Sequence, residues 1–524
     1  MEGDLKAPGG KTDLITRTAI GAVLACLAPG LALAQTATPS AEPGSGTEVE
    51  AVVVTGTRVP QPNLTSVSPV QVVTAQEVTL GGRTVTADLI NQLPQIQQNS
   101  QTALSTTSNP LSGPGGVATI DLRGLGQTRT LVLVDGRRLG LGDPNTGNPN
   151  PSPDINQIPA QLIDRIDVLT GGASATYGSD AIAGVVNFIM RRNFDGVQID
   201  VQESVFQHNQ HSDLARGVLG DAGIAVPTDH MDGFSPDISL IAGRNFADGR
   251  ANLTAYVTYH EQKPVLQGSR DYAACQINVD PTGQPSCAGS SNSNVFYLAS
   301  GLGDAFAVSG TEFVPYGGAT PTNPPALFNS NAYSSLLQQD RRITAGLFAR
   351  YEIDPHLELY GDFQYMHDLT QVRTAPSGLF QGGGPSSTGG FLVNCNNPFL
   401  SAGQQSALGC TAAQIASGDT VDLYIGRRNV EGGPRISDYR HENFRVVAGA
   451  RGQLAGPLRY DIYASYYRTT LDASLSNYLG LTNVQNALLV TQGAGGPACI
   501  SGGSCVPFNI FQDGGVTPAA LAYL

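Results

Sequence analysis

Residues that often carry covalent chemistry are present in this 524-residue chain, but they stand in no catalytic pattern. Ser174 lies in the run Gly-Gly-Ala-Ser-Ala-Thr, which lacks the glycine two residues after serine that a nucleophile elbow requires. Carboxylates are plentiful, yet no motif pairs them for acid–base work. The sequence contains no glycine-rich phosphate loop and no metal-binding motif. We therefore expect a protein that is not an enzyme and that needs no cofactor.

Apart from Cys26, the cysteines fall into three pairs, and each pair lies within one long segment between predicted strands. No pair has C-x-x-C spacing and no cysteine is expected within a strand, so a metal or redox site is only the alternative interpretation. An exported protein, as the N-terminus indicates below, would favour oxidised thiols. We predict three local disulfides: Cys275 with Cys287, Cys395 with Cys410, and Cys499 with Cys505.

The seven histidines are scattered along the chain. His208, His211 and His230 share one long segment and are candidate metal ligands. Because they match no ligand spacing, we expect loose surface side chains and assign no metal site.

The elements that would position functional residues are clearest in the segment 155–190. Ile166 and Val168 alternate with charged residues, which indicates a strand that ends near Gly171. Small residues follow, and they allow backbone segments to approach closely. The apolar run from Val185 to Met190 predicts a second strand.

This order of residues resembles the end of the plug domain of TonB-dependent outer-membrane receptors, whose pattern is I-P…I-x-R-I-x-V-x-x-G-x-x-S-x-x-Y-G-x-x-A-x-x-G-V-V-N. Upstream, Thr130–Leu139 resembles the family's R-T-L-V-L-V-D-G-V-R-L, with a hairpin turn expected at its Asp-Gly pair. Gly172 and Met190 depart from the pattern, which often has proline and threonine there. The resemblance implies an α+β plug over 59–192. It assigns the plug motif to Arg123, Gly124, Asp135, Gly136, Arg165, Gly171, Ser174, Tyr177, Gly178, Gly184 and Asn187.

The N-terminus has the composition of an export signal. Basic residues precede an apolar run over 19–33, and Ala32-Leu33-Ala34 is an A-x-A cleavage site, so a signal peptide over 1–34 is predicted. A lipoprotein signal ending at Cys26 is the alternative, disfavoured because the apolar run continues past that residue. A Pro- and Ser-rich flexible linker follows over 35–47. The resemblance implies the cell outer membrane as the destination.

The segment 48–58 reads E-V-E-A-V-V-V-T-G-T-R, which could be an ordinary strand with a turn at Gly56. Ahead of a plug pattern it resembles a TonB box, a β-prone segment that adds as a strand to the sheet of a TonB-type inner-membrane protein. The partner-binding residues implied by this resemblance are Glu50, Ala51, Val52, Val53, Val54 and Thr55.

After Asn193 the hydrophobic period becomes two, in seven segments between Val197 and Tyr467. A soluble β-sandwich would share this alternation. The connections, however, alternate strictly between short and long, as they do in outer-membrane barrels. The short ones are 246–250, 353–356 and 454–458, and the long ones are 208–234, 264–339 and 374–436. We expect 193–524 to be part of an antiparallel transmembrane β-barrel. Its apolar face would meet lipid, and its polar face would line a lumen where some plug charges pair with the wall.

Seven strands are too few to enclose the plug, since barrels of this kind have about 22. The sequence after the last predicted strand is loop-like. We therefore expect a truncated barrel, from a fragment or a cut gene.

Together these features predict an outer-membrane receptor for TonB-coupled uptake of a small scarce solute. A siderophore, cobalamin, another metal chelate or an oligosaccharide would all fit the family. A net charge of −14 argues against nucleic acid as a partner. Two alternatives remain, a passive outer-membrane porin and a secreted β-rich adhesin.

Overall fold

The computed structural model describes residues 70–97, 115–145, 151–171, 173–280, 282–290, 292–298, 305–316, 327–456 and 458–524. They all belong to the second of two compact units, Val53–Leu524. The predicted signal peptide, linker and TonB box lie outside the described residues. Within these ranges, no helix is long and apolar enough to cross a membrane.

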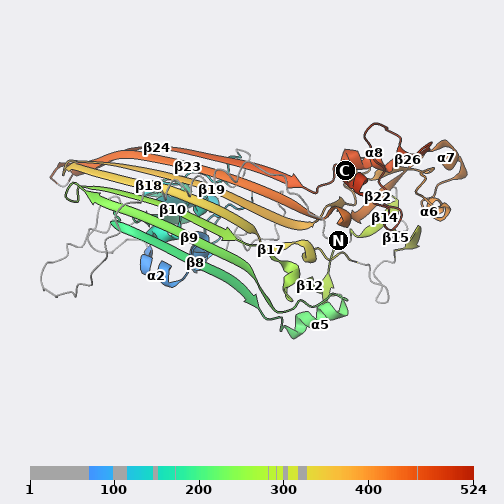
Figure 1. Ribbon diagram of the computed structural model, residues 1–524, viewed down its shortest axis with the longest axis horizontal. Coiled ribbons are helices and arrows are strands. Elements are labelled where there is room, and N and C mark those ends of the chain that lie inside the picture. Colours follow the sequence, from blue (N-terminus) through green and yellow to red (C-terminus); the bar gives the residue numbers. More distant parts are fainter. Residues whose placement is uncertain are drawn as a thin grey trace, which may run out of the picture. The chain divides into compact units, whose positions relative to one another are not determined.

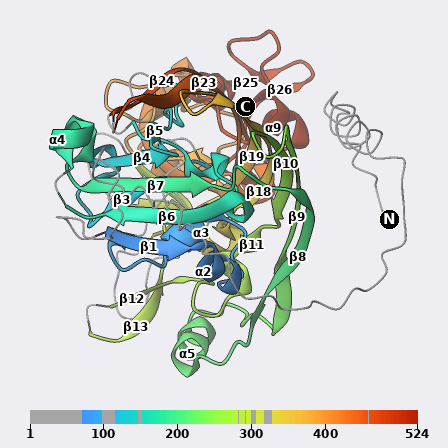
Figure 2. The same cartoon turned by 90° about the vertical axis from the view of Figure 1, so that its left-hand side faces the viewer.

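The N-terminal part folds as a small five-stranded sheet with the order β1-β6-β7-β4-β5 (Figure 2). Only the β4–β7 pair is parallel. The two central strands carry fully buried Ile166, Val168, Val186 and Phe188, because short helices and the larger sheet cover the plug. The strands are β1 (Val70–Thr74), β4 (Thr130–Val134), β5 (Arg137–Arg138), β6 (Ile163–Leu169) and β7 (Gly184–Met190).

Short elements complete this α+β unit. A capping box starts the first helix, in which the Thr74 N–H donates to Glu77 Oε2 at 2.7 Å and the Glu77 N–H to Thr74 Oγ1 at 3.3 Å. The helices are α2 (Ala75–Leu80), α3 (Thr86–Ile90) and α4 (Ser174–Tyr177), and a minor ribbon joins β2 (Ile96–Gln97) to β3 (Asp121–Leu122).

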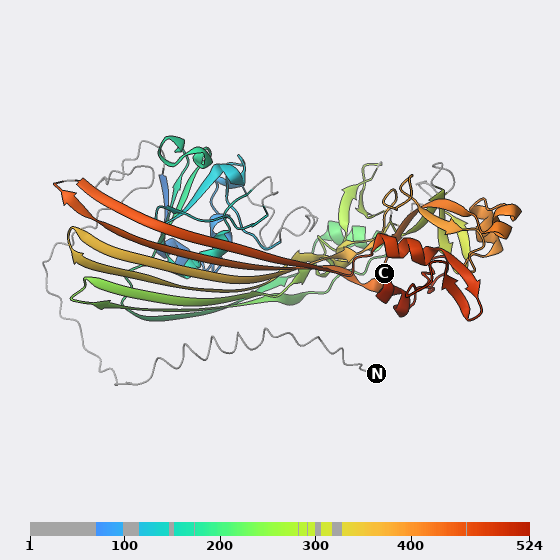
Figure 3. The same ribbon diagram turned by 90° about the horizontal axis from the view of Figure 1, so that it is seen from above.

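The second part is a seven-stranded antiparallel sheet in which each strand pairs with its neighbours in sequence (Figures 1 and 3). All seven predicted strands are confirmed. β8 and β24 are its edges, so in the part of the chain that the structure describes this sheet does not close into a barrel. The strands are β8 (Gly196–His208), β9 (His230–Phe246), β10 (Ala251–Gln262), β18 (Gln339–Asp354), β19 (Leu357–Pro376), β23 (Pro434–Ala455) and β24 (Leu458–Ser476).

The two faces of this sheet differ as the alternation predicts. On β19, Asp362 and Gln364 are buried, while Phe363 between them lies on the opposite face beside Phe444. On β8 the outward Val201 is 73% exposed. The polar face is the one that contacts the plug, through the hydrogen bonds described below.

The long connections are not the irregular loops that the sequence predicts. Parts of two of them, 294–298 with 305–316 and 377–429, fold together with the segment 479–524 after β24 around one core that includes Phe296, Phe391, Phe508 and Phe511, and we call this unit the loop domain. Its strands are β14 (Asn294–Leu298), β15 (Ala305–Ser309), β16 (Glu312–Pro315), β20 (Gly378–Leu379), β21 (Phe391–Asn394), β22 (Thr420–Arg428), β25 (Val490–Gly493) and β26 (Gly496–Cys499). Its helices are α6 (Ala402–Ala407), α7 (Ala412–Ser417), α8 (Leu481–Leu488) and α9 (Pro518–Tyr523).

A smaller lobe forms where the β8–β9 and β10–β18 connections meet. Helix α5 (Asp213–Asp221) packs Val218 and Leu219 against Cys275. The remaining strands of this region are β11 (Val265–Leu266), β12 (Gln276–Val279), β13 (Pro285–Ala288) and β17 (Ser335–Leu337).

Candidate functional site: the interface between plug and sheet

The predicted Asp-Gly hairpin turn joins β4 to β5 and organises the plug motif. Asp135 and Gly136 have φ of 51° and 76°, the left-handed pair that a type I′ turn needs. The Gly136 N–H donates to Asn187 Oδ1 at 2.9 Å, and Asp135 Oδ1 accepts from the Met190 N–H at 3.0 Å. The turn is therefore fixed to β7, and the motif residues Asp135, Gly136 and Asn187 meet in one place.

Gly184 is required by a close approach of two strands. Its φ is 146°, and a Cβ there would lie 2.1 Å from the carbonyl oxygen of Leu169. Gly184, the first residue of β7, thus allows the close antiparallel contact of β6 and β7.

The other motif residues serve local contacts within the plug. Arg123, at φ 57° beside Gly124, donates to the Ala183 carbonyl at 2.9 Å. The Tyr177 carbonyl, at the end of α4, accepts from Arg138 Nη2 at 2.7 Å. Arg165 pairs with Asp167 at 3.2 Å. The remaining members, Gly171, Ser174 and Gly178, lie within or beside α4, whose last residue contacts Arg138 on β5.

Arg192 links the plug to the sheet. Its guanidinium donates to both carboxylate oxygens of Asp362 on β19, at 2.7 and 2.6 Å, and through Nε to Asp135 at 2.8 Å. Burial opposes the charge on this guanidinium, but the two carboxylates outweigh it and hold the pKa of Arg192 above its ordinary value. The plug motif did not include this residue. Its signal was the basic pair that directly follows β7.

Arg137, the residue directly after the Asp-Gly turn, is a second anchor of the plug on the sheet. Arg137 Nη2 donates to the Tyr360 hydroxyl at 2.7 Å and pairs with Asp461 Oδ2 at 3.2 Å. Its guanidinium carbon lies 5.0 Å from the ring centroid of Tyr463 on β24. The expectation that plug charges pair with the wall is confirmed at this arginine.

Two more plug loops touch the sheet without a full ion pair. Gln157 donates to the Tyr467 hydroxyl at 3.0 Å, and Thr469 Oγ1 donates to the Leu141 carbonyl at 2.7 Å. On the other side, Thr84 Oγ1 donates to Asp237 Oδ2 at 2.7 Å.

A polar cavity of about 110 Å³ lies between the plug and the sheet. Thr84 and Asn156 line it from the plug, and His260, Asp340 and Arg342 line it from the sheet. It has room for water molecules and is polar enough to hold them.

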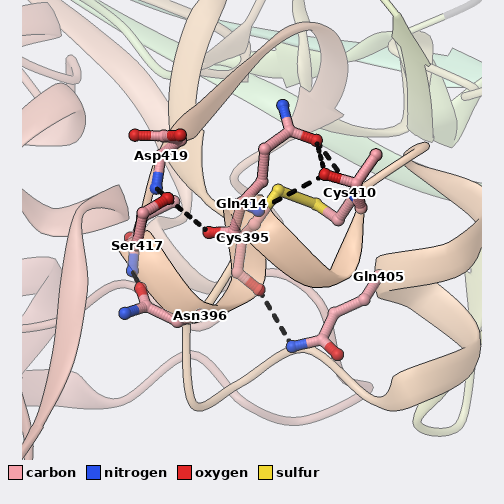
Figure 4. Close-up of a disulfide and its surroundings, with 9 residues drawn as sticks. Cys395, Asn396, Gln405, Cys410, Gln414, Ser417 and Asp419 are labelled. Carbon is pink, nitrogen blue, oxygen red and sulfur yellow. Dashed lines mark hydrogen bonds between the residues drawn. A yellow bond between two sulfur atoms is a disulfide. The ribbon is translucent and has the colours of Figure 1, made fainter.

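The six cysteines form the three predicted disulfides, Cys275–Cys287, Cys395–Cys410 and Cys499–Cys505. The expectation that none lies in a strand is wrong, because Cys287 belongs to β13 and Cys499 to β26. In the loop domain, Cys395–Cys410 ties α6 to the end of β21, and Gln405 Nε2 donates to the Cys395 carbonyl at 2.9 Å (Figure 4).

His208 and His230, at the two ends of the first long connection, are cross-strand neighbours on β8 and β9, but each contacts an aspartate of its own. His208 contacts Asp271 at 3.1 Å and His230 contacts Asp232 at 3.1 Å. In the ranges given above, no group of three or more His, Cys, Asp or Glu residues could hold a metal ion.

Among solved structures, the chain is similar to bacterial siderophore receptors. A mutant of the ferric enterobactin receptor PfeA from Pseudomonas aeruginosa, in complex with enterobactin, is 16% identical with a TM-score of 0.40, covering 77% of this chain and 41% of that one. The siderophore receptor PirA from Acinetobacter baumannii is 15% identical with a TM-score of 0.32, covering 77% and 48%. The siderophore receptor PiuA from the same organism is 13% identical with a TM-score of 0.35, covering 81% and 48%. The chain thus spans less than half the length of these receptors.

The match to a family model covers the five-stranded plug unit and not the larger sheet. Residues 62–185 match the model described as TonB-dependent Receptor Plug Domain. This range includes β1, the Asp-Gly turn and the start of β7, so the five-stranded unit is the matched domain. Residues 62–185 therefore form a domain that matches the plug domain of TonB-dependent receptors.

Proposed function

We propose that this protein is an outer-membrane receptor that takes up a scarce solute by TonB coupling, with no covalent chemistry. The observation that carries the proposal is a plug domain held by ion pairs on the polar face of an amphipathic antiparallel sheet. Polar contacts of this kind can be released one at a time by a pull, in addition to the apolar contacts that Ile241, Tyr256 and Phe348 of the sheet make with the plug core.

The sheet is proposed to be part of the wall of a transmembrane β-barrel. Its strands run from 12 residues in β10 to 22 in β23, which is enough to span a bilayer when tilted. Edge strands β8 and β24 leave backbone groups that lipid cannot satisfy, so in a membrane further strands must pair with them.

The coupling step is assigned to the segment 48–58. Residues 50–55 would add as a strand to the sheet of a TonB-type inner-membrane protein. Several backbone hydrogen bonds loaded in shear would then pass the pull to β1, the first described strand of the plug.

The solute is proposed to be a siderophore, since the similar structures are named as siderophore or ferric enterobactin receptors. Cobalamin, other metal chelates and oligosaccharides are the competing solutes.

The test is binding of the detergent-purified chain, starting at Gln35, to the periplasmic domain of a TonB-type protein. Val53→Pro removes one backbone donor and should weaken binding by about tenfold or more, because proline cannot donate to a β-ladder. Thr36→Pro in the linker is the matched control and should bind like the unmodified chain. Equal binding by both variants would exclude 48–58 as the coupling segment. A passive porin would instead keep its solute flux after deletion of 48–57.

A further inference from the structure

Two arginines lie side by side where the sheet joins the loop domain, and neither forms an ion pair with a described carboxylate. Arg428 is the last residue of β22, and Arg435 is the second residue of β23. Arg435 Nε donates to the carbonyl of Ala375 at 2.8 Å, and Arg428 Nη1 donates to the carbonyl of Pro376, the next residue, at 3.1 Å. Two adjacent carbonyls at the end of β19 therefore hold the two guanidiniums close together.

The guanidiniums pack against aromatic rings instead of carboxylates. The guanidinium carbon of Arg428 lies 5.0 Å from the ring centroid of Phe380 and 5.5 Å from that of Phe328. The guanidinium carbon of Arg435 lies 5.5 Å from the ring centroid of Tyr478. An aromatic face attracts a cation but does not neutralise its charge. Within the described ranges, this place thus carries two positive charges without a compensating negative charge.

Three hydrogen-bond donors at the same place are buried and have no partner in the part of the chain that the structure describes. They are Arg428 Nε and the hydroxyl groups of Thr374 and Tyr478. Thr374 is directly opposite Arg435 in the register of β19 and β23, so the two side chains lie on one face of the sheet. A buried donor without an acceptor costs free energy. A bound anion with several oxygens would supply both the acceptors and the missing charge.

The neighbouring arginine of β22 shows the difference. Arg427 Nη2 pairs with Glu431 Oε1 at 2.5 Å, and its charge is compensated. Arg428 has no such partner: burial and, to a smaller extent, repulsion by Arg435 lower the pKa of Arg428 to about 10. An anion between the two guanidiniums would oppose both effects.

The two arginines lie on the route from the loop domain to the plug. Arg435 and Tyr439 are four residues apart on β23 and therefore lie on the same face of the strand. Tyr439 contacts the plug, since a Cβ on Gly115 would lie 2.7 Å from its ring. A solute that enters from the loop domain would therefore meet Arg428 and Arg435 before it meets the plug.

We propose that Arg428 and Arg435 form an anion-binding site that recognises a carboxylate or phosphate group of the solute. Guanidinium groups suit these anions because their N–H donors match the spacing of two anion oxygens. The inference rests on the proposed function, because it names the chemical class of the solute that the receptor takes up. Among the competing solutes, it favours an acidic chelate over a neutral oligosaccharide.

The first experiment uses the unmodified detergent-purified chain, starting at Gln35, so it does not depend on the folding of a variant. Phenylglyoxal modifies accessible arginines, and mass spectrometry of peptides reads the extent at each position. Citrate, used as a carboxylate probe, should slow the modification of Arg428 and Arg435 by about tenfold or more at saturation. Sodium chloride at the same ionic strength and the neutral sugar maltose should not protect them. Exposed Arg216 on α5 is the internal control and should react equally in every sample.

The second experiment measures citrate affinity by isothermal titration calorimetry. Arg428→Gln and Arg435→Gln should each weaken binding by about tenfold or more, because each removes a charged donor. Arg435→Lys keeps the charge but loses the planar group, so it should restore part of the affinity. Arg427→Gln is the matched control, since Arg427 is adjacent on β22 but already pairs with Glu431, and it should bind citrate like the unmodified chain.

Equal modification of Arg428 and Arg435 with and without citrate would overturn the proposal, and so would equal citrate affinity in Arg428→Gln and Arg427→Gln. Protection by phosphatidylglycerol micelles but not by citrate would indicate a lipid headgroup site and would overturn the assignment to the solute. The TonB-binding test does not involve this site, so failure of the site and failure of the proposed function are distinguishable.

Discussion

Arg192 is an ion-pair anchor between the plug and the sheet. Its guanidinium satisfies Asp362, whose side chain is 0% exposed, and Asp135, which is 11% exposed. Arg192→Gln leaves both carboxylates without their cation, and a broken buried pair costs about 3–5 kcal/mol. We expect a loss of this size in the free energy of unfolding of the plug, measured by urea titration of the detergent-solubilised chain.

The matched control is Arg138→Gln. Arg138 also pairs with an aspartate, Asp180, but both side chains are about half exposed. Exposed pairs contribute up to about 1 kcal/mol, so the control should change little. Equal losses in the two variants would show that Arg192 is not an anchor.

Substitutions at two glycines of the plug motif distinguish the cost of a steric clash from the cost of backbone strain. Gly184→Ala places a Cβ 2.1 Å from the Leu169 carbonyl oxygen, at a φ that favours glycine, and should cost about 3 kcal/mol or more. Gly136→Ala also has a positive φ, but no atom lies within 4 Å of its Cβ, so about 1 kcal/mol is expected. Thermal unfolding of the two variants tests this order, and a larger loss at Gly136 would contradict it.

At the scale of single residues, the sequence predicts the backbone conformation better than it predicts which side chains contact one another. The Asp-Gly turn follows from residue type alone. That Asn187 would hold the turn depends on the pairing of β4 with β7 within the plug, and that Arg192 would reach Asp362 across 170 positions depends on how the plug docks on the sheet. Asp167 shows the same limit: in an alternating strand it is expected on a solvated face, yet it is 2% exposed because the larger sheet and the helices cover β6.

Among the elements, the seven long strands are predictable because one constraint governs each of them. Every second residue lies on the plug side of the sheet and every other one on the outward side, so the period of two persists for 12 to 22 residues. The loop domain has no such constraint. Its strands are mostly 2 to 5 residues long and are held by amides from distant segments, such as Asn394 Nδ2 to the Val490 carbonyl at 2.8 Å. No short segment of the sequence indicates such contacts between distant residues.

The two disulfides of the loop domain should stabilise it to different extents. Cys395–Cys410 closes 15 positions and Cys499–Cys505 closes 6. Because the entropy removed from the unfolded chain grows with loop length, we expect Cys395→Ser with Cys410→Ser to cost about 3 kcal/mol. The matching pair at 499 and 505 should cost less. Urea unfolding, followed by hydrogen exchange of peptides within 391–425, gives the comparison, and a larger loss at the shorter loop would argue against this account.

For the molecule as a whole, the polar contacts between plug and sheet fall into two groups, beside the apolar contacts of Ile241, Tyr256 and Phe348. Arg137 and Arg192 anchor one turn by ion pairs with Asp461 and Asp362. Thr84 and Gln157 make single hydrogen bonds elsewhere on the sheet. A pull on the plug therefore meets a few strong contacts at one place and weak ones around it, and we expect the anchored turn to yield last.

The central claim is that one face of the seven-stranded sheet meets lipid while the other meets the plug. It is tested most directly by spin labels placed one at a time along β19 at Phe363, Gln364, Tyr365 and Met366, in the chain reconstituted in bilayers with its disulfides intact. Gln364 and Met366 are 4% and 1% exposed on the plug side, so labels there should be shielded from both oxygen in lipid and a water-soluble paramagnetic complex. Labels at Phe363 and Tyr365 should collide with oxygen and not with the water-soluble complex. Contact of both faces with the water-soluble complex, or no alternation along the strand, would contradict the account.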